Sequence, residues 1–194
     1  MGVDEDTVVV TSDRMPPIPA EEMTAEQKDA AREIASGRRG ELGGPFVPAL
    51  RSPELTRRLQ RLGEYLRYDL ALEPRLREMV ILLTAREWTQ EYEWHIHAPI
   101  ALASGLAPGI ISAIAEKSRP VDMAVDEALV YDFFKELQRE KSVGDTLYTR
   151  AVDAFGERGV IDLVGAIGYY TTLAMIMNVA RTPLPEGKTP AFRT

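Results

Sequence analysis

Apolar side chains recur along this chain at the spacing of helices. The clearest case is a stripe of leucines one turn apart, and we expect this stripe to pack against other apolar residues, within the chain or at an interface. Its members are Leu55, Leu59, Leu62 and Leu66. The stretch 163–177 has no charge, but it is only 15 residues long and is interrupted by Gly, Tyr and Thr, so it predicts a buried core helix and no membrane span. The only β-rich triplet is at 8–10, so we expect an all-α fold.

Capping and breaking residues divide the chain into about eight helices. Thr24 and Gln27 form a capping-box pattern, and Gly37 is suited to end the helix that follows. Ser52 and Asp145 are suited to cap later helices. The segment 37–48 is rich in Gly and Pro and is predicted to be a loop. The predicted helices cover about 24–36, 52 onward, 74–88, 91–104, 108–117, 126–141, 145–155 and 159 onward.

Residues 1–20 are expected to form an extended N-terminal arm, and residues 21–194 a single helical domain. The arm holds Pro16, Pro17 and Pro19, which fix φ and remove backbone donors. A length of 194 residues with 45% apolar and 27% charged residues is typical of one soluble globular domain. The start of the chain is acidic and lacks the pattern of a signal peptide, so we expect a cytoplasmic protein.

Charge and cysteine content exclude several classes of function. The net charge of −7, with basic residues scattered among acids, argues against a nucleic-acid partner. The chain has no cysteine, which excludes disulfides, zinc–thiolate sites, iron–sulfur clusters and thiol nucleophiles. Any catalysis must therefore use carboxylates and histidine.

The segment 88–97 contains both histidines and both tryptophans of the chain. On a helix, Gln90, Glu93 and His97 lie at positions i, i+3 and i+7 and project from one face. His95 points about 200° away from His97, so the two histidines are badly placed to share a metal ion. The remaining metal hypothesis is a site of His97, Glu93 and Glu78, which would have one imidazole and two carboxylates. We expect no metal here.

Glu78 and His97 are predicted to meet across a helical hairpin. Glu78 lies about ten residues before the turn and His97 about seven after it, which leaves an axial offset of about 5 Å. A carboxylate beside an imidazole fixes its tautomer and stabilises the imidazolium, giving an acid/base pair. Glu93 is a candidate second acid or base. The alternative is structural, because a buried His–Glu pair is often only a satisfied polar contact, and aromatic residues such as Trp88 usually fill a core or interface.

The runs Leu76–Leu82, Glu91–Trp94 and Ala101–Leu106, together with His97, resemble the carboxymuconolactone decarboxylase-like family over about residues 50–120. The resemblance implies an oligomeric, all-helical bundle like alkylhydroperoxidase D. That family includes a cofactor-free decarboxylase and a peroxidase type that uses a Cys-x-x-Cys pair with a Glu and a His. The Glu corresponds to Glu78 and the His to His97. The two cysteines correspond to Gln90 and Glu93, so thiol peroxidase activity is not expected.

The leading hypothesis is a cofactor-independent lyase that uses acid/base chemistry on a small carboxylated lactone or keto acid. His97 would deliver a proton to carbon, Glu78 would orient His97, and Glu93 would tune it or steer a water. Arg39 and Arg67 are candidates to bind the substrate carboxylate. Further candidates for substrate binding are Gln90, Trp94 and Tyr169. The alternatives are a peroxidase-related protein without its redox cysteines and a non-catalytic ligand-binding oligomer. A homo-oligomer, as a dimer, trimer or hexamer, is expected.

Overall fold

A computed structural model of the chain describes residues 13–192, and this part consists of helices and connecting loops without a strand. The expected all-α class with about eight helices is confirmed. The helices are α1 Ala25–Ser36, α2 Phe46–Ala49, α3 Pro53–Tyr68, α4 Pro74–Glu87, α5 Glu91–Ala103, α6 Pro108–Ala115, α7 Val125–Glu140 and α8 Asp145–Ala180. Residues 1–12 of the predicted arm, with the triplet 8–10, lie outside the described residues.

The predicted helix ends follow from local chemistry. The Thr24 hydroxyl accepts a hydrogen bond from the Gln27 backbone N–H at 3.2 Å, and the Gln27 side chain accepts one from the Thr24 backbone N–H at 2.9 Å. Prolines occupy the first position of α3, α4 and α6, where a missing N–H costs nothing. Gly105 follows α5 with φ +94°, a conformation that favours glycine. The pattern of caps and breakers therefore located these helices correctly.

Two elements differ from the prediction. The predicted loop 37–48 contains the four-residue helix α2, which buries Phe46 and Ala49 in the core. The helices predicted at 145–155 and from 159 onward form the single element α8, interrupted at Gly156 with φ 70° and ψ 168°. The chain therefore bends there and resumes as a helix, since glycine adopts positive φ with little strain. The break was expected, but its residue was not.

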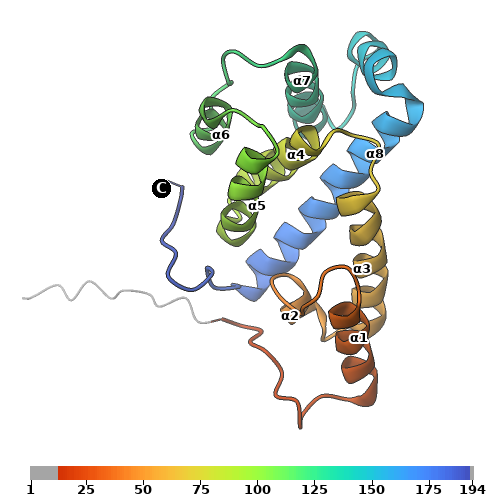
Figure 1. The fold of residues 1–194 in the computed structure, drawn as a ribbon, viewed down its shortest axis with the longest axis vertical. Coiled ribbons are helices and arrows are strands. Elements are labelled where there is room, and N and C mark those ends of the chain that lie inside the picture. The colour runs from red at the N-terminus through yellow and green to blue at the C-terminus, as the bar shows by residue number, and fades with distance from the viewer. Residues whose placement is uncertain (1–12, 193–194) are drawn as a thin grey trace, which may run out of the picture.

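Helix α8 runs diagonally through the view in Figure 1, with α4 and α5 on one side and α3 on the other. Helix α4 contacts α5, α6, α7 and α8, and its residues from Glu78 to Ala85 are all buried. Helix α1 packs on α3, away from the α4–α5 hairpin. The core is therefore built around α4 and the C-terminal half of α8.

Among the described residues, α8 is long and apolar enough to cross a membrane by length and composition alone. Its most apolar window is 56% buried inside the protein. Leu163, Ala166 and Leu173 are at most 3% exposed, so the predicted core helix over 163–177 is confirmed.

The predicted leucine stripe of α3 is only half buried. Leu59 and Leu66 are in the core, whereas Leu55 and Leu62 are 48% and 45% exposed. The buried face of α3 includes Gly63. Helix α8 approaches closely there, since a Cβ at Gly63 would lie 2.0 Å from the Tyr169 hydroxyl oxygen. Two of the four leucines therefore pack within the chain, and Leu55 and Leu62 are left on the surface.

Gly63→Ala is expected to lower the free energy of unfolding by about 1–3 kcal/mol, since the new methyl group overlaps a buried aromatic ring. Gly168→Ala is a matched control, because no atom beyond its own helix lies within 4 Å of the added Cβ. That variant is expected to gain roughly 0.5–1 kcal/mol from helix propensity. Urea denaturation of both variants measures the difference, and equal stabilities would contradict the close packing of α3 on Tyr169.

The described part of the N-terminal arm, residues 13–20, has no helix and docks on its own chain. The Arg14 backbone N–H donates to the Ala180 carbonyl at 2.8 Å. The Arg51 guanidinium donates to the carbonyl oxygens of Met15 at 3.3 Å and Pro16 at 2.8 Å. Order in this segment comes from contacts with α8 and with the turn between α2 and α3.

Candidate functional site

Glu78 and His97 are in direct contact across the α4–α5 hairpin. The Nδ1 atom of His97 lies 2.8 Å from Oε2 of Glu78. The Nε atom of Arg77 donates to Oε1 of Glu78 at 3.3 Å, so both carboxylate oxygens have a partner. Both Glu78 and His97 are buried. The antiparallel geometry of the hairpin thus joins the two residues that the spacing brought within reach.

The contacts of Glu78 determine its charge. Burial by itself raises the pKa of Glu78, but the hydrogen bond and charge of His97, with the charge of Arg77, lower it below the ordinary value. Glu78 is therefore ionised near neutral pH. Nδ1 of His97, which faces this carboxylate, must then carry a hydrogen. Nε2 is the ring nitrogen that remains available to a ligand.

Glu93 lies one turn before His97 on α5 and has a different environment. Its side chain is buried, and its Oε2 atom has no hydrogen-bond partner among the described residues. Burial raises the pKa of Glu93 well above the ordinary value. Burial therefore favours the protonated, neutral form of Glu93, which has a hydrogen that it can donate.

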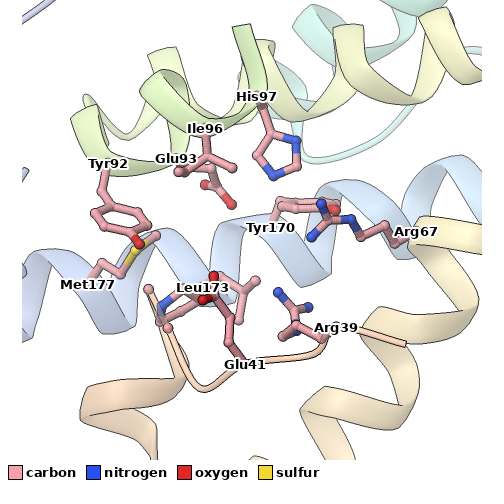
Figure 2. A pocket seen from close by; sticks show the side chains of 13 residues that line it. Arg39, Glu41, Arg67, Tyr92, Glu93, Ile96, His97, Tyr170, Leu173 and Met177 are labelled. Atoms are coloured by element: carbon pink, nitrogen blue, oxygen red, sulfur yellow. The ribbon is translucent and has the colours of Figure 1, made fainter. Parts of the chain in front are cut away.

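A cavity of about 170 Å³ lies beside these groups (Figure 2). Glu93 and His97 line it from α5, Arg67 from α3, Tyr170 from α8 and Arg39 from the loop before α2. Four separate parts of the chain thus bring acid, base and cationic groups to one small space. This volume lies below the roughly 300–1,000 Å³ of pockets for drug-sized ligands, so it suits a small molecule.

The two arginines of the cavity lack acidic partners among residues 13–192. The Nε atom of Arg39 donates to the Gln60 side-chain oxygen at 3.0 Å, and its guanidinium lies 4.4 Å from the centre of the Phe46 ring. Arg67 lies 5.7 Å from the centre of the Tyr68 ring. Two uncompensated guanidinium groups beside one cavity favour an anionic ligand, above all a carboxylate.

The other candidates for substrate binding, Gln90, Trp94 and Tyr169, do not line this cavity. Gln90 caps α5, because its side chain accepts from the Tyr92 backbone N–H at 2.7 Å and donates to Asn178 at 2.8 Å. Trp94 packs edge-on against the Phe192 ring, with the ring centres 5.0 Å apart. Tyr169 is buried against Gly63.

Tyr170 takes the place in the cavity that Tyr169 was expected to have. Its ring packs edge-on against the His97 ring, with the centres 5.6 Å apart. Burial raises the pKa of both tyrosines, that of Tyr169 to about 12, so both remain neutral donors. Tyr170, Leu173 and Met177 share one face of α8, because they are three and four residues apart. This spacing groups them from the sequence alone, but it does not show which face of α8 meets α5.

His95 does not line the cavity. The Nε2 atom of His95 lies 2.8 Å from the Thr189 carbonyl oxygen in the C-terminal segment, away from His97. Within residues 13–192, no three His, Asp or Glu side chains are grouped to hold a metal ion. The set of His97, Glu93 and Glu78 thus forms no such cluster in the described part of the chain.

Residues 53–124 match the Carboxymuconolactone decarboxylase family. This segment contains Arg67, Glu78, Glu93 and His97, and it runs from the start of α3 to the residue before α7. Over this segment the chain is similar to the carboxymuconolactone decarboxylase family, and the all-helical fold of the described residues is consistent with the alkylhydroperoxidase D type, as the resemblance predicted. None of the curated proteins compared with the chain matches it.

Proposed function

We propose that this protein is a cofactor-independent lyase that acts on a small carboxylated lactone or keto acid. One observation carries the proposal. A single small cavity combines two arginines without acidic partners among the described residues, a buried acid and a histidine aligned by an ionised carboxylate. The match to the family over residues 53–124 supports the class of protein, and the cavity supports the chemistry.

The reaction follows from these groups. Arg39 and Arg67 hold the substrate carboxylate in its ionised form and set the direction of the bond that breaks. The electron pair of the C–C bond moves into the neighbouring carbonyl, CO₂ leaves, and an enolate forms. The protonated carboxyl of Glu93 donates a hydrogen bond to the enolate oxygen. His97 delivers a proton to carbon, and solvent then restores the proton on the imidazole.

Glu78 and Tyr170 act through His97 in this scheme. The ionised Glu78 holds one ring nitrogen and stabilises the imidazolium that serves as the acid. Tyr170 packs edge-on against the imidazole and limits its rotation. Nε2 is thereby directed to the reacting carbon.

A panel of lactones and keto acids tests this reaction, with CO₂ release and incorporation of solvent deuterium as readouts. Both readouts are expected for the wild type on at least one substrate, to be weaker for Glu78→Gln, and to be lost for His97→Ala. Equal rates for all three proteins on every active substrate would contradict the assigned roles. Absence of both readouts across the panel would contradict lyase activity on these compounds.

We also propose that the protein is a homo-oligomer of the cytoplasm, without a nucleic-acid or membrane partner. The support is an exposed apolar surface on α3 and α8. It includes Leu55, Leu62, Ile161, Met175 and Val179, which are between 39% and 69% exposed. Light scattering of the purified protein measures the mass, and a monomer at micromolar concentration would contradict the proposal.

A further inference from the structure

The cavity beside His97 has two chemically different ends. In Figure 2, Arg39 and Arg67 lie on one side with Tyr170, while Tyr92 and Met177 lie on the other. A ligand whose carboxylate contacts the arginines must therefore extend toward Tyr92 and Met177. The proposed lyase reaction involves the end with the two arginines, and it assigns no role to the end with Tyr92 and Met177.

The second end is mainly apolar. Met177 and Leu173 are at most 3% exposed and line the cavity from α8, and Ile96 lines it from α5 at 37% exposure. Burying a charged group against these side chains would cost more than burying a hydrocarbon of the same size. This surface suits an uncharged part of the ligand.

Glu41 adds a charge to this end. Its side chain points into the cavity from the loop before α2 and reaches toward Leu173 (Figure 2). Burial raises the pKa of Tyr92, and the negative charge of Glu41 raises it further, in keeping with the position of Glu41 at this end. Arg39 donates to Gln60 and forms no ion pair with Glu41 among residues 13–192. A second carboxylate on the ligand would meet this charge.

We infer that the cavity selects short monocarboxylates with an uncharged remainder, and that Glu41 is the residue that rejects a second carboxylate. This inference rests on the proposed function for the end of the ligand that meets the arginines. Beyond the proposed function, it specifies that the end of the ligand away from the arginines is uncharged and apolar. The cavity of about 170 Å³ limits the length of the remainder.

Valerate, glutarate and δ-aminovalerate test the inference, because they share a five-carbon chain and differ only in the far end. Isothermal titration calorimetry of the wild-type protein at low ionic strength is expected to give a Kd for valerate roughly tenfold below that for glutarate, the size expected for like charges a few Å apart at a partly exposed site. Since Glu41 is exposed, the ratio should shrink in high salt. Valerate should also bind more tightly than δ-aminovalerate, because the cost of burying the ammonium against Leu173 and Met177 exceeds its attraction to the exposed Glu41.

Glu41→Gln removes the charge with little change of shape. It is expected to bring the Kd values for valerate and glutarate to within about threefold of each other, because the like-charge repulsion is gone. Glu157→Gln is the control, since it makes the same change in net charge at an exposed position on α8 outside the cavity lining. This control should keep the wild-type ratio.

Ile96→Ala tests the apolar end separately. It enlarges the apolar part of the cavity lining, so heptanoate should gain affinity at least about threefold relative to valerate, in line with roughly 0.8 kcal/mol per buried methylene. Leu102→Ala removes an exposed apolar side chain from the same helix outside this cavity and should leave the ratio unchanged.

The outcomes separate this inference from the lyase proposal. Equal binding of valerate and glutarate, tighter binding of δ-aminovalerate, or no binding of any of the three acids would overturn the inference. The predicted order of affinities without CO₂ release or deuterium exchange would support the inference and count against the lyase proposal. A glutarate penalty that persists in Glu41→Gln would show that Glu41 is not the discriminating residue.

Discussion

Glu93→Leu is expected to lower turnover about 100-fold or more, because it removes the hydrogen-bond donor proposed for the enolate oxygen. Leucine has a similar volume and keeps the buried site filled. Glu93→Gln keeps a weaker N–H donor and should fall between Glu93→Leu and the wild type. Steady-state rates on the best substrate of the panel give this ordering. A leucine variant with wild-type turnover would contradict the role of Glu93.

The same substitutions are expected to raise stability at alkaline pH. The pKa of Glu93 is raised above 4.5 in the folded protein, so between the two pKa values the folded chain keeps a proton that the unfolded chain has lost. The stability of the wild type then falls as pH rises, by about 1.4 kcal/mol per unit for this one group. Glu93→Gln has no such group, so its stability relative to the wild type increases with pH in that window.

Urea denaturation near pH 5 and near pH 9 measures this difference. Glu157→Gln controls for an ordinary exposed carboxyl and should show no gain on the alkaline side. If the difference between Glu93→Gln and the wild type does not change with pH, Glu93 is ionised in the folded protein. Loss of activity together with a gain in stability would mark Glu93 as a group kept for function.

Glu78→Ala is expected to lower the free energy of unfolding at neutral pH by about 3–5 kcal/mol, the usual cost of removing one partner of a buried ion pair. For a chain of this size, even the lower figure of about 3 kcal/mol corresponds to a drop in Tm of roughly 6–12 °C. Arg77 would lose its carboxylate contact as well. Differential scanning calorimetry at neutral pH gives the drop.

Acid should reduce this difference. Because the pKa of Glu78 is lowered in the folded protein, its contribution is fully present above the unfolded value of 4.5 and is lost as pH falls through the folded value. The difference between the wild type and Glu78→Ala should therefore shrink as pH falls below 4.5, by at most about 1.4 kcal/mol per unit. A difference that stays constant through this range would show that the contribution of Glu78 is not electrostatic.

A double-mutant cycle separates the pair from its surroundings. Glu78→Ala and His97→Ala each leave a buried polar partner alone, so the double variant should be less destabilised than the sum of the two single variants. Additive losses would mean that the two side chains are not coupled, despite their contact.

Much of the fold could be predicted because helix ends depend on neighbouring residues. Thr24 with Gln27, the prolines at the starts of α3 and α4, and Gly105 after α5 act through bonds within one turn. The rotation of α3 could not be predicted, because it depends on Tyr169, which is about a hundred residues from Gly63 in the chain. Helix α2 was missed because four residues carry too little periodicity to be recognised.

For the candidate site, the sequence by itself determined the absence of thiol chemistry and the approach of Glu78 to His97. Both depend on composition or on the 3.6-residue repeat across one short turn. Only the tertiary structure decided that Arg39 and Arg67 meet in one cavity, that Tyr170 faces it in place of Tyr169, and that Glu93 is buried without a partner for its Oε2 atom among the described residues. The reason is physical: the exposure of a side chain and the charge it carries depend on which distant segments pack against it, and local spacing does not contain that information.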